Sequence, residues 1–343
     1  MVTTRKLNRV RNSFYVYLPR NWIRTHGLNA KSEVRIQQTS EGTLEILPPE
    51  FETGGAKLLK FTMDNKREER IEGILIGAYI VGASAMEFEF PDTIDMSTRE
   101  MFSRWIRKLP GFEILDEHRR SLTVSDTSEK QLVAPILRRQ FATTKYMLNG
   151  LTGAIQSGEL EGAGRILDRD EDVDRHRYFV ERLCHLALQD PTYAKKIGIS
   201  PADCLHFSLA TKYIERIADH VCGATEQMIQ LKQVSTSVRR AVDALGQAYD
   251  NTTRTFFAID SSRGRESITN ASAEAFEALS KSKMVSNRMS RLETSSKNVG
   301  PRMVLLLMHL ERIASYCADI GEVAINRIIE SSIGGSRLAP VET

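Results

Sequence analysis

The sequence has little that would support secretion, membrane insertion or a cysteine-based site. The most apolar stretch, residues 74–86, is too short to cross a bilayer, and no signal peptide precedes the first expected strand. The four cysteines lie far apart without the paired spacing of a metal site, so we expect them to be small core residues in a reducing compartment. The sequence thus predicts a soluble cytoplasmic protein without membrane insertion. The cysteines are Cys184, Cys204, Cys222 and Cys317.

Acidic residues are absent from the first 32 positions, although the whole chain of 343 residues has a net charge of only +3. Seven basic residues stand in this stretch, and such a local asymmetry is more informative than the total charge. They are Arg5, Lys6, Arg9, Arg11, Arg20, Arg24 and Lys31.

Residues 1–50 are predicted to form a small β-rich unit that ends at Pro48-Pro49. The patterns predict a strand, a short helix closed by Gly27 and two hairpin strands, at residues 13–18, 21–26, 32–37 and 43–47. About forty residues make a poor core alone, so we expect strands from a second copy of the chain to complete it.

This order of elements resembles the AbrB-type swapped-hairpin DNA-binding domain. The likeness is carried by Arg5-Lys-Leu-Asn-Arg-Val-Arg-Asn-Ser-Phe-Tyr-Val-Tyr-Leu-Pro-Arg-Asn-Trp and by Gly27-Leu-Asn-Ala-Lys-Ser-Glu-Val, although family members usually carry glycine where this chain has Arg11-Asn12. The resemblance implies a homodimer whose first strand and loop contact DNA. A solvated basic face on a dimerisation module is the alternative. The matching basic positions are Arg5, Lys6, Arg9 and Arg11.

Residues 58–126 are predicted to form a small β-α-β-α-β-β module. Ser97-Thr-Arg-Glu100 matches a capping box at the start of its second helix, which Pro110-Gly111 follows. The segment contains no phosphate-binding glycine loop and no catalytic constellation, so we expect a structural spacer or a weak ligand pocket.

From Ser128 onward the apolar residues follow a helical period. Residues 214, 217, 221, 224, 228 and 231 keep the 3–4 spacing of an antiparallel bundle. Tyr213-Ile-Glu-Arg-Ile-Ala-Asp-His220 recurs as His309-Leu-Glu-Arg-Ile-Ala-Ser-Tyr316, an offset suited to a duplicated bundle. The sequence therefore predicts two tandem three-helix bundles, at 128–232 and 235–331, in a multidomain α+β protein.

Carboxylates four residues apart on a helix share one face. Two such pairs occur in the first predicted bundle, and together they would form an oxygen-rich patch for a hard divalent cation or an iron cluster, with His220 as a further ligand. Since Ile214 and Ile217 occupy the seam, we expect the acids to lie on an exposed flank. The alternative is a solvated acidic face. The four acids are Asp170, Asp174, Glu215 and Asp219.

Ile214-Glu-Arg-Ile-Ala-Asp-His-Val221 and Asp170-Glu-Asp-Val-Asp174 resemble the helix motifs of the PhoU family of phosphate-uptake regulators, over residues 128 to about 331. The resemblance implies two three-helix bundles whose paired carboxylates bind metal clusters. An AbrB-like unit followed by such bundles resembles archaeal phosphate-uptake regulators. The second repeat departs from the pattern because Ser315 replaces a carboxylate. Its fifth helix offers only Glu266 with Asn270, or Asn270 with Glu274.

Three classes of function follow. The first is a DNA-binding transcriptional regulator of phosphate uptake, whose helical half senses metal or contacts a phosphate transporter or sensor component. The second is an adaptor that dimerises through residues 1–50 and negatively regulates a phosphate transporter without touching DNA. Charge favours the first, because an adaptor needs no excess of bases in its first 32 residues. The third, a carboxylate metalloenzyme, is not expected, because the acids should face outward and no Glu-x-x-His motif occurs.

Overall fold

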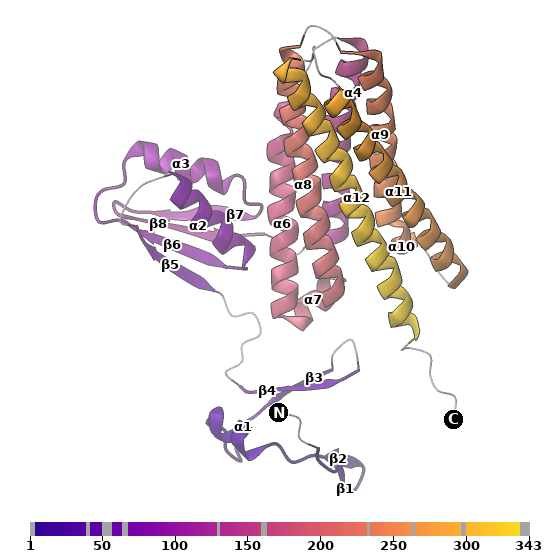
Figure 1. Cartoon of the computed structure of the whole chain (residues 1–343). Coiled ribbons are helices and arrows are strands. Elements are labelled where there is room, and N and C mark those ends of the chain that lie inside the picture. The colour runs from indigo at the N-terminus through magenta and orange to yellow at the C-terminus, as the bar shows by residue number, and fades with distance from the viewer. Residues whose placement is uncertain are drawn as a thin grey trace. The chain divides into compact units, whose positions relative to one another are not determined.

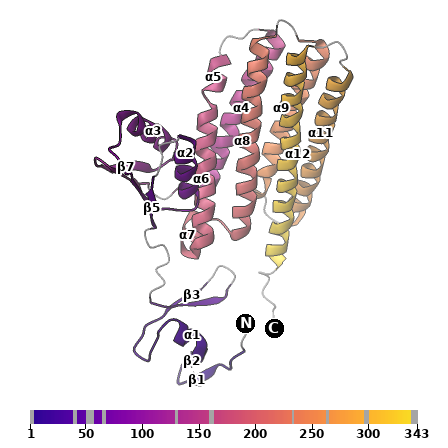
Figure 2. The same ribbon diagram turned by 60° about the vertical axis from the view of Figure 1, so that its left-hand side comes forward.

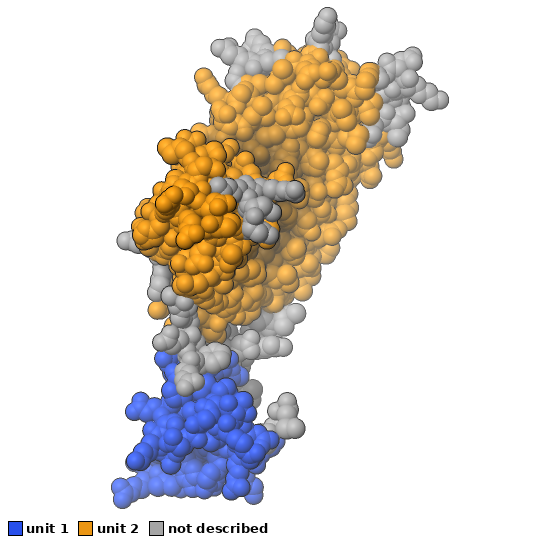
Figure 3. Space-filling model, turned by 90° about the vertical axis from the view of Figure 1, so that its left-hand side faces the viewer, with its two compact units in different colours: residues 1–55 blue, residues 56–343 orange. Residues whose placement is uncertain are grey.

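The chain divides into two units, residues 1–55 and residues 56–343 (Figure 3). We call them the N-terminal unit and the main unit and describe each by itself. The structure is a computed structural model, and it describes residues 4–38, 42–49, 57–63, 68–128, 131–158, 163–231, 234–261, 265–295 and 300–336.

The N-terminal unit consists of two hairpins and a short helix. The first hairpin pairs β1 with β2 and the second pairs β3 with β4, both antiparallel, and they form separate two-stranded sheets. The predicted order of strand, helix and hairpin is confirmed, whereas β1 was not predicted. The bounds are β1 (Asn8–Val10), β2 (Ser13–Tyr15), α1 (Arg20–Thr25), β3 (Arg35–Gln38) and β4 (Leu44–Leu47).

Arg11 forms the turn between β1 and β2 with a φ of 55°. It is the one residue other than glycine with a positive φ among the residues described. This conformation normally favours glycine or asparagine in tight hairpin turns. The turn therefore keeps the left-handed backbone although arginine stands where glycine is usual.

The N-terminal unit has almost no buried apolar surface of its own. Of the residues described in it, Pro48 alone is buried. Leu7, Phe14, Ile36 and Leu44 are each at least 60% exposed. A unit with so little burial lacks the main favourable contribution to folding.

The first part of the main unit is the predicted α/β module. Its four strands lie in the order β5-β6-β8-β7, with β5 parallel to β6 and the other pairs antiparallel (Figure 1). Helices α2 and α3 pack on one face, where the rings of Phe88 and Phe102 are 4.9 Å apart. The bounds are β5 (Leu58–Thr62), α2 (Glu68–Ile80), β6 (Ala85–Glu89), α3 (Met96–Ile106), β7 (Phe112–Glu117) and β8 (Ser121–Asp126).

The predicted capping box of α3 is wrong by two residues. Asp95 is the N-cap, and its carboxylate accepts a hydrogen bond of 2.8 Å from the backbone N–H of Thr98. The Ser97 hydroxyl donates to the same Asp95 oxygen. A carboxylate near the first turn is favoured by the helix dipole as well as by the hydrogen bond, and the sequence motif alone did not reveal that choice.

Six long helices form two triangles, as predicted (Figures 1 and 2). Helices α4, α6 and α8 pack on one another, as do α9, α11 and α12, and the triangles meet along α8 with α12 and along α4 with α9. The predicted start of the fifth long helix, at 262–264, lies outside the described residues. The bounds are α4 (Val133–Ser157), α5 (Ala163–Leu167), α6 (Asp170–Gln189), α7 (Pro191–Ile197), α8 (Pro201–Ile229), α9 (Thr236–Phe256), α10 (Ala258–Ser261), α11 (Arg265–Ser295) and α12 (Pro301–Ser336).

The sequence marks the ends of these helices clearly. Gly158 ends α4 with a φ of 79°, a left-handed conformation that glycine adopts without strain. Ser200 and Asp203 form a reciprocal capping box ahead of α8, with Pro201 at its first turn. Within the described helices, none is long and apolar enough to span a bilayer.

The α/β module and most of the helical part contribute to one large hydrophobic cluster, whose buried residues range from Met63 to Ala324. A second, small cluster joins α11 to α12 and consists of Ala271, Ala275, Ile325 and Ile328. Arg182 of α6 joins the two parts: it is 3% exposed and donates to the Tyr79 carbonyl and the Asp126 carboxylate, each at 2.6 Å. The predicted segments 58–126, 128–232 and 235–331 therefore lie within one unit.

Candidate functional site

The predicted acidic patch lies where α6 and α8 pack side by side (Figure 1). Asp170 and Asp174 occupy the first turns of α6, and Glu215 and Asp219 lie in the second half of α8. The four side chains are near enough to influence one another, because the charges of Asp170, Glu215 and Asp219 all raise the pKa of Asp174. The helical spacing therefore placed these residues in one region.

Glu215 corrects one expectation. We expected it to be exposed, but it is only 7% exposed. Helix α8 contacts α4, α6 and α12, so the flank beside the Ile214–Ile217 seam is covered as well. Asp219, by contrast, has a side chain that is 38% exposed.

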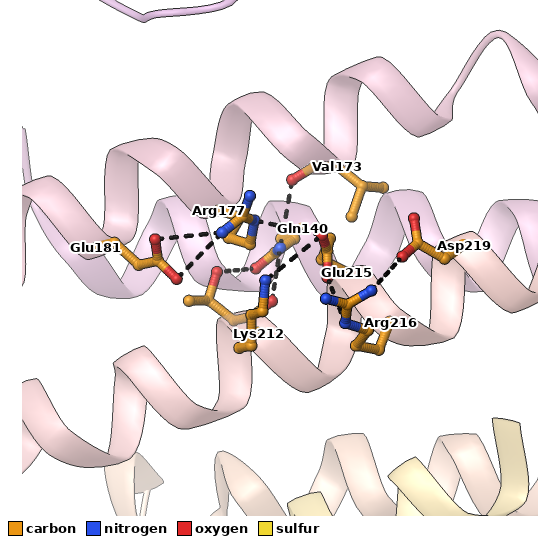
Figure 4. A network of polar contacts seen from close by, with 9 residues as sticks. Gln140, Val173, Arg177, Glu181, Lys212, Glu215, Arg216 and Asp219 are labelled. Atoms are coloured by element: carbon orange, nitrogen blue, oxygen red, sulfur yellow. Dashed lines mark hydrogen bonds and ion pairs between the residues drawn. The ribbon is translucent and has the colours of Figure 1, made fainter. Parts of the chain in front are cut away.

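Three basic side chains surround Glu215 (Figure 4). Its oxygens lie 3.6 Å from Arg177 Nε, 3.7 Å from Lys212 Nζ and 3.5 Å from Arg216 Nε. These separations suit ion pairs but are too long for good hydrogen bonds, and Glu215 Oε2 is a buried atom without a hydrogen-bond partner. Arg216 also donates to Asp219 at 3.1 Å. Glu215 is therefore held by cations already.

Arg177 was missed in the sequence. Its side chain is 13% exposed and lies between Glu215 and Glu181 (Figure 4). The Nη1 atom of Arg177 lies 3.4–3.5 Å from the two carboxylate oxygens of Glu181. The signal that could have found it is the spacing of Asp174, Arg177 and Glu181, which places the three on one face of α6.

The aspartates of the patch are partly buried close to one another, which disfavours their charged form. Burial raises the pKa of Asp174 to about 7, and the neighbouring Asp170 adds to the effect. Burial also raises the pKa of Asp170 and of Asp219. Folding raises the pKa of Asp174, so protonated Asp174 stabilises the folded state. This contribution to the free energy of unfolding is complete below pH 3.8, the ordinary pKa of an aspartate, and is lost as the pH rises through about 7. A bound cation would offset this cost.

The donor set fits a hard cation only in part. Oxygen ligands are present in Asp170, Asp174 and Asp219, and Glu215 Oε2 has no hydrogen-bond partner. In the part of the chain that the structure describes, however, no three His, Cys, Asp or Glu side chains are arranged to hold one ion. Glu215 would have to leave Arg177 to become a ligand.

The second repeat has a hydroxyl network at the corresponding position. Glu311 Oε1 accepts hydrogen bonds of 2.8 Å from Ser286 and 2.7 Å from Ser315. The partner of Glu311 on α11 is thus Ser286, and the predicted partners on that helix were wrong because α11 runs antiparallel to α12 in a different register. Those predicted partners were Glu266, Asn270 and Glu274.

His220 is directed at another histidine instead of serving the acids. Its Nδ1 atom lies 2.9 Å from Nδ1 of His309 on α12. Burial lowers the pKa of His220 to about 4, with a further contribution from His309. The predicted fifth ligand therefore belongs to the contact between the two triangles.

The predicted DNA-binding residues are all exposed. Arg9 lies in β1 and Arg11 in the turn that follows, and Arg9 Nε donates to the Arg11 carbonyl at 2.9 Å. The Arg9 guanidinium also lies 6.0 Å from the Phe14 ring centre. Arg5 and Lys6 precede β1, so the four bases are available on one short segment of the N-terminal unit.

Residues 137–228 match the PhoU domain. The match runs from α4 to α8 and thus contains the whole acidic patch, whereas the second repeat lies outside it. Among solved structures, the chain is similar to the phosphate transport system regulatory protein PhoU from Streptococcus pneumoniae, with 16% sequence identity and a TM-score of 0.42. That likeness covers 56% of this chain and 91% of the other. No curated protein matches the sequence.

Proposed function

We propose that the protein is a transcriptional regulator of phosphate uptake, with a DNA-binding N-terminal unit and a PhoU-like helical half that senses metal or contacts a transporter or sensor component. The match of residues 137–228 to the PhoU domain carries the assignment to phosphate regulation. We do not expect catalysis by the helical half, because the sequence has no Glu-x-x-His motif.

DNA binding is supported by the N-terminal unit. Seven basic residues and no acidic ones occupy the first 32 positions, and the four predicted contacts are exposed. The unit resembles the AbrB-type domain, and its exposed Phe14 and Leu44 offer apolar surface that a second copy would bury. A homodimer would place two sets of bases against one duplex and neutralise twice as many phosphates.

Replacing Arg9 and Arg11 together by alanine is expected to weaken DNA binding. The loss should be roughly 1–3 kcal/mol for each base contact removed, and less where only phosphates are touched. Gel retardation or fluorescence anisotropy at matched salt, on DNA found by footprinting promoters near the gene, measures the change. The control is Arg104→Ala, a half-exposed base of α3 in the main unit. Equal binding by the double variant and the parent would remove these residues from the interface.

The same PhoU match supports an adaptor that never contacts DNA. In that alternative the N-terminal unit only dimerises, and the helices bind a phosphate transporter. A parent protein that shows no footprint and no salt-dependent DNA affinity would favour the adaptor over the regulator.

We also propose that Asp170, Asp174, Glu215 and Asp219 bind a divalent cation or an iron cluster in the first repeat alone. The support is the charge that these acids gather, reflected in the raised pKa of Asp174. When bound, the cation would relieve carboxylate repulsion and draw Glu215 away from Arg177. Glu311 accepts two hydroxyl hydrogen bonds and has no such need.

Asp219→Asn is expected to release bound metal, whereas Glu311→Gln should leave it in place. The physical reason is that Asp219 is one of four acids in its patch, while Glu311 faces Ser286 and Ser315. Elemental analysis of the parent and the two purified variants measures the difference. Equal metal content in the parent and in Asp219→Asn would leave the patch as a solvated acidic face.

A further inference from the structure

An imidazole pair lies at the contact between the two helical triangles. His220 belongs to α8 and His309 to α12, and their Nδ1 atoms are 2.9 Å apart. The ring centres are 5.2 Å apart, and the His220 ring stacks on Tyr316 at 5.8 Å. Two helices from different repeats thus direct two nitrogen donors at one point.

The hydrogen bond between the rings fixes their chemistry. One Nδ1 must donate a proton and the other must accept it, so at least one ring is a neutral imidazole with a lone pair directed at its neighbour. Neutral imidazole nitrogen is the preferred ligand of Zn²⁺ and similar cations. Two nitrogens on one tetrahedral zinc lie about 3.3 Å apart, so the Nδ1 atoms need to separate by about 0.4 Å and the rings to tilt until both lone pairs point at the metal.

Gly223 makes room for this pair. A Cβ atom at position 223 would lie 2.3 Å from His309 Cε1 and 2.7 Å from its Nε2. The His309 ring therefore occupies space that only glycine leaves free, one turn beyond His220 on the same helix. This contact fixes the His309 ring opposite His220 instead of leaving it to sample solvent.

The charges around the pair do not themselves attract a cation. At His220, Arg312 and Arg216 each lower the pKa more than Glu311 raises it, and at His309 Glu226 acts in the opposite sense to burial. Attraction for a metal must therefore come from the imidazole nitrogens themselves. Such a site selects a nitrogen-preferring transition metal over Mg²⁺ or Ca²⁺.

We propose that His220 and His309 form a two-nitrogen site for a borderline transition-metal cation of the Zn²⁺ class, which links the two three-helix bundles. Water completes the coordination, because no third His, Cys, Asp or Glu side chain among the described residues is arranged to join the pair. The site differs from the acidic patch because its ligands are nitrogen atoms instead of carboxylate oxygens. Its second ligand comes from α12, whereas the acidic patch combines α8 with α6. A cation here ties α8 to α12 directly, so its binding strengthens the contact between the repeats.

The test is titration of the full-length protein with ZnCl₂ by calorimetry, together with thermal melting in the presence and absence of Zn²⁺. His220→Gln and His309→Gln are each expected to weaken Zn²⁺ binding about tenfold or more and to remove the Zn²⁺-dependent rise in melting temperature. His185→Gln, which changes an exposed histidine of α6, is the matched control and should bind as the parent does.

Gly223→Ala gives a second, independent readout. It keeps both imidazoles but displaces the His309 ring, so it should weaken Zn²⁺ binding, whereas adventitious binding to a surface histidine would not change. Absence of Zn²⁺ binding by the parent, or unchanged binding by His309→Gln, overturns the proposal. Loss of Zn²⁺ in an Asp170→Asn/Asp174→Asn double variant, with both histidine variants unaffected, overturns it too and assigns the cation to the acidic patch.

Discussion

Replacing Arg177 by leucine is expected to lower the free energy of unfolding of the main unit by about 3 kcal/mol, at the low end of the range for breaking a buried ion pair. The change leaves Glu215, which is 7% exposed, without its most buried counter-charge. Lys212 and Arg216 remain near Glu215, which is why the upper end is not expected. Urea denaturation followed by circular dichroism measures the difference.

Arg169→Leu is the matched control for this prediction. Arg169 is the N-cap residue of α6 and pairs with Asp172, but the two side chains are 54% and 42% exposed. Its loss should cost much less, because water screens this exposed pair. Adding Glu215→Leu to Arg177→Leu should recover much of the stability, since no buried charge is then left alone. Equal losses from Arg177→Leu and Arg169→Leu would show that Glu215 does not depend on its buried partner.

Removing residues 1–50 is expected to reduce the oligomeric state of the protein. The full chain should be at least a dimer, because the apolar residues of the N-terminal unit gain burial only from a second copy. Sedimentation equilibrium or light scattering compares the masses of the two proteins. The main unit retains its own core after the cut.

A second variant separates assembly from the cut itself. Phe14→Lys combined with Leu44→Lys places charge on two side chains that are 67% and 68% exposed in a single chain. In one chain these changes should be tolerated, whereas in a dimer interface they should dissociate the copies. A truncated protein with the parent's oligomeric order would place the interface in the helical half.

The sequence predicted those helices and strands in which the periodic apolar residues are also the residues buried in the structure. Ile214, Ile217 and Val221 repeat at helical spacing and are all fully buried in α8. The strand pairs of the α/β module likewise follow from alternation between turns. These signals are local, so one sequence suffices to read them.

What the sequence could not predict depends on neighbouring helices. Glu215 is charged and adjacent to the seam, so it reads as exposed until α6 brings Arg177 against it. His220 was grouped with the nearby acids, although its partner lies 89 residues further along the chain. The register of α11 against α12 likewise decides that Ser286 faces Glu311. Each of these contacts depends on how two helices pack against each other, which the sequence of either helix alone does not determine.

Helix α6 connects the acidic patch to the α/β module through Arg182. The same rigid helix carries Asp170 at its first residue and Arg182 twelve residues later, a span of about 18 Å at 1.5 Å per residue. Arg182 donates hydrogen bonds to the Tyr79 carbonyl of α2 and to the Asp126 carboxylate of β8. A displacement at the acidic end of α6 would therefore be transmitted along one continuous helix to both elements of the α/β module.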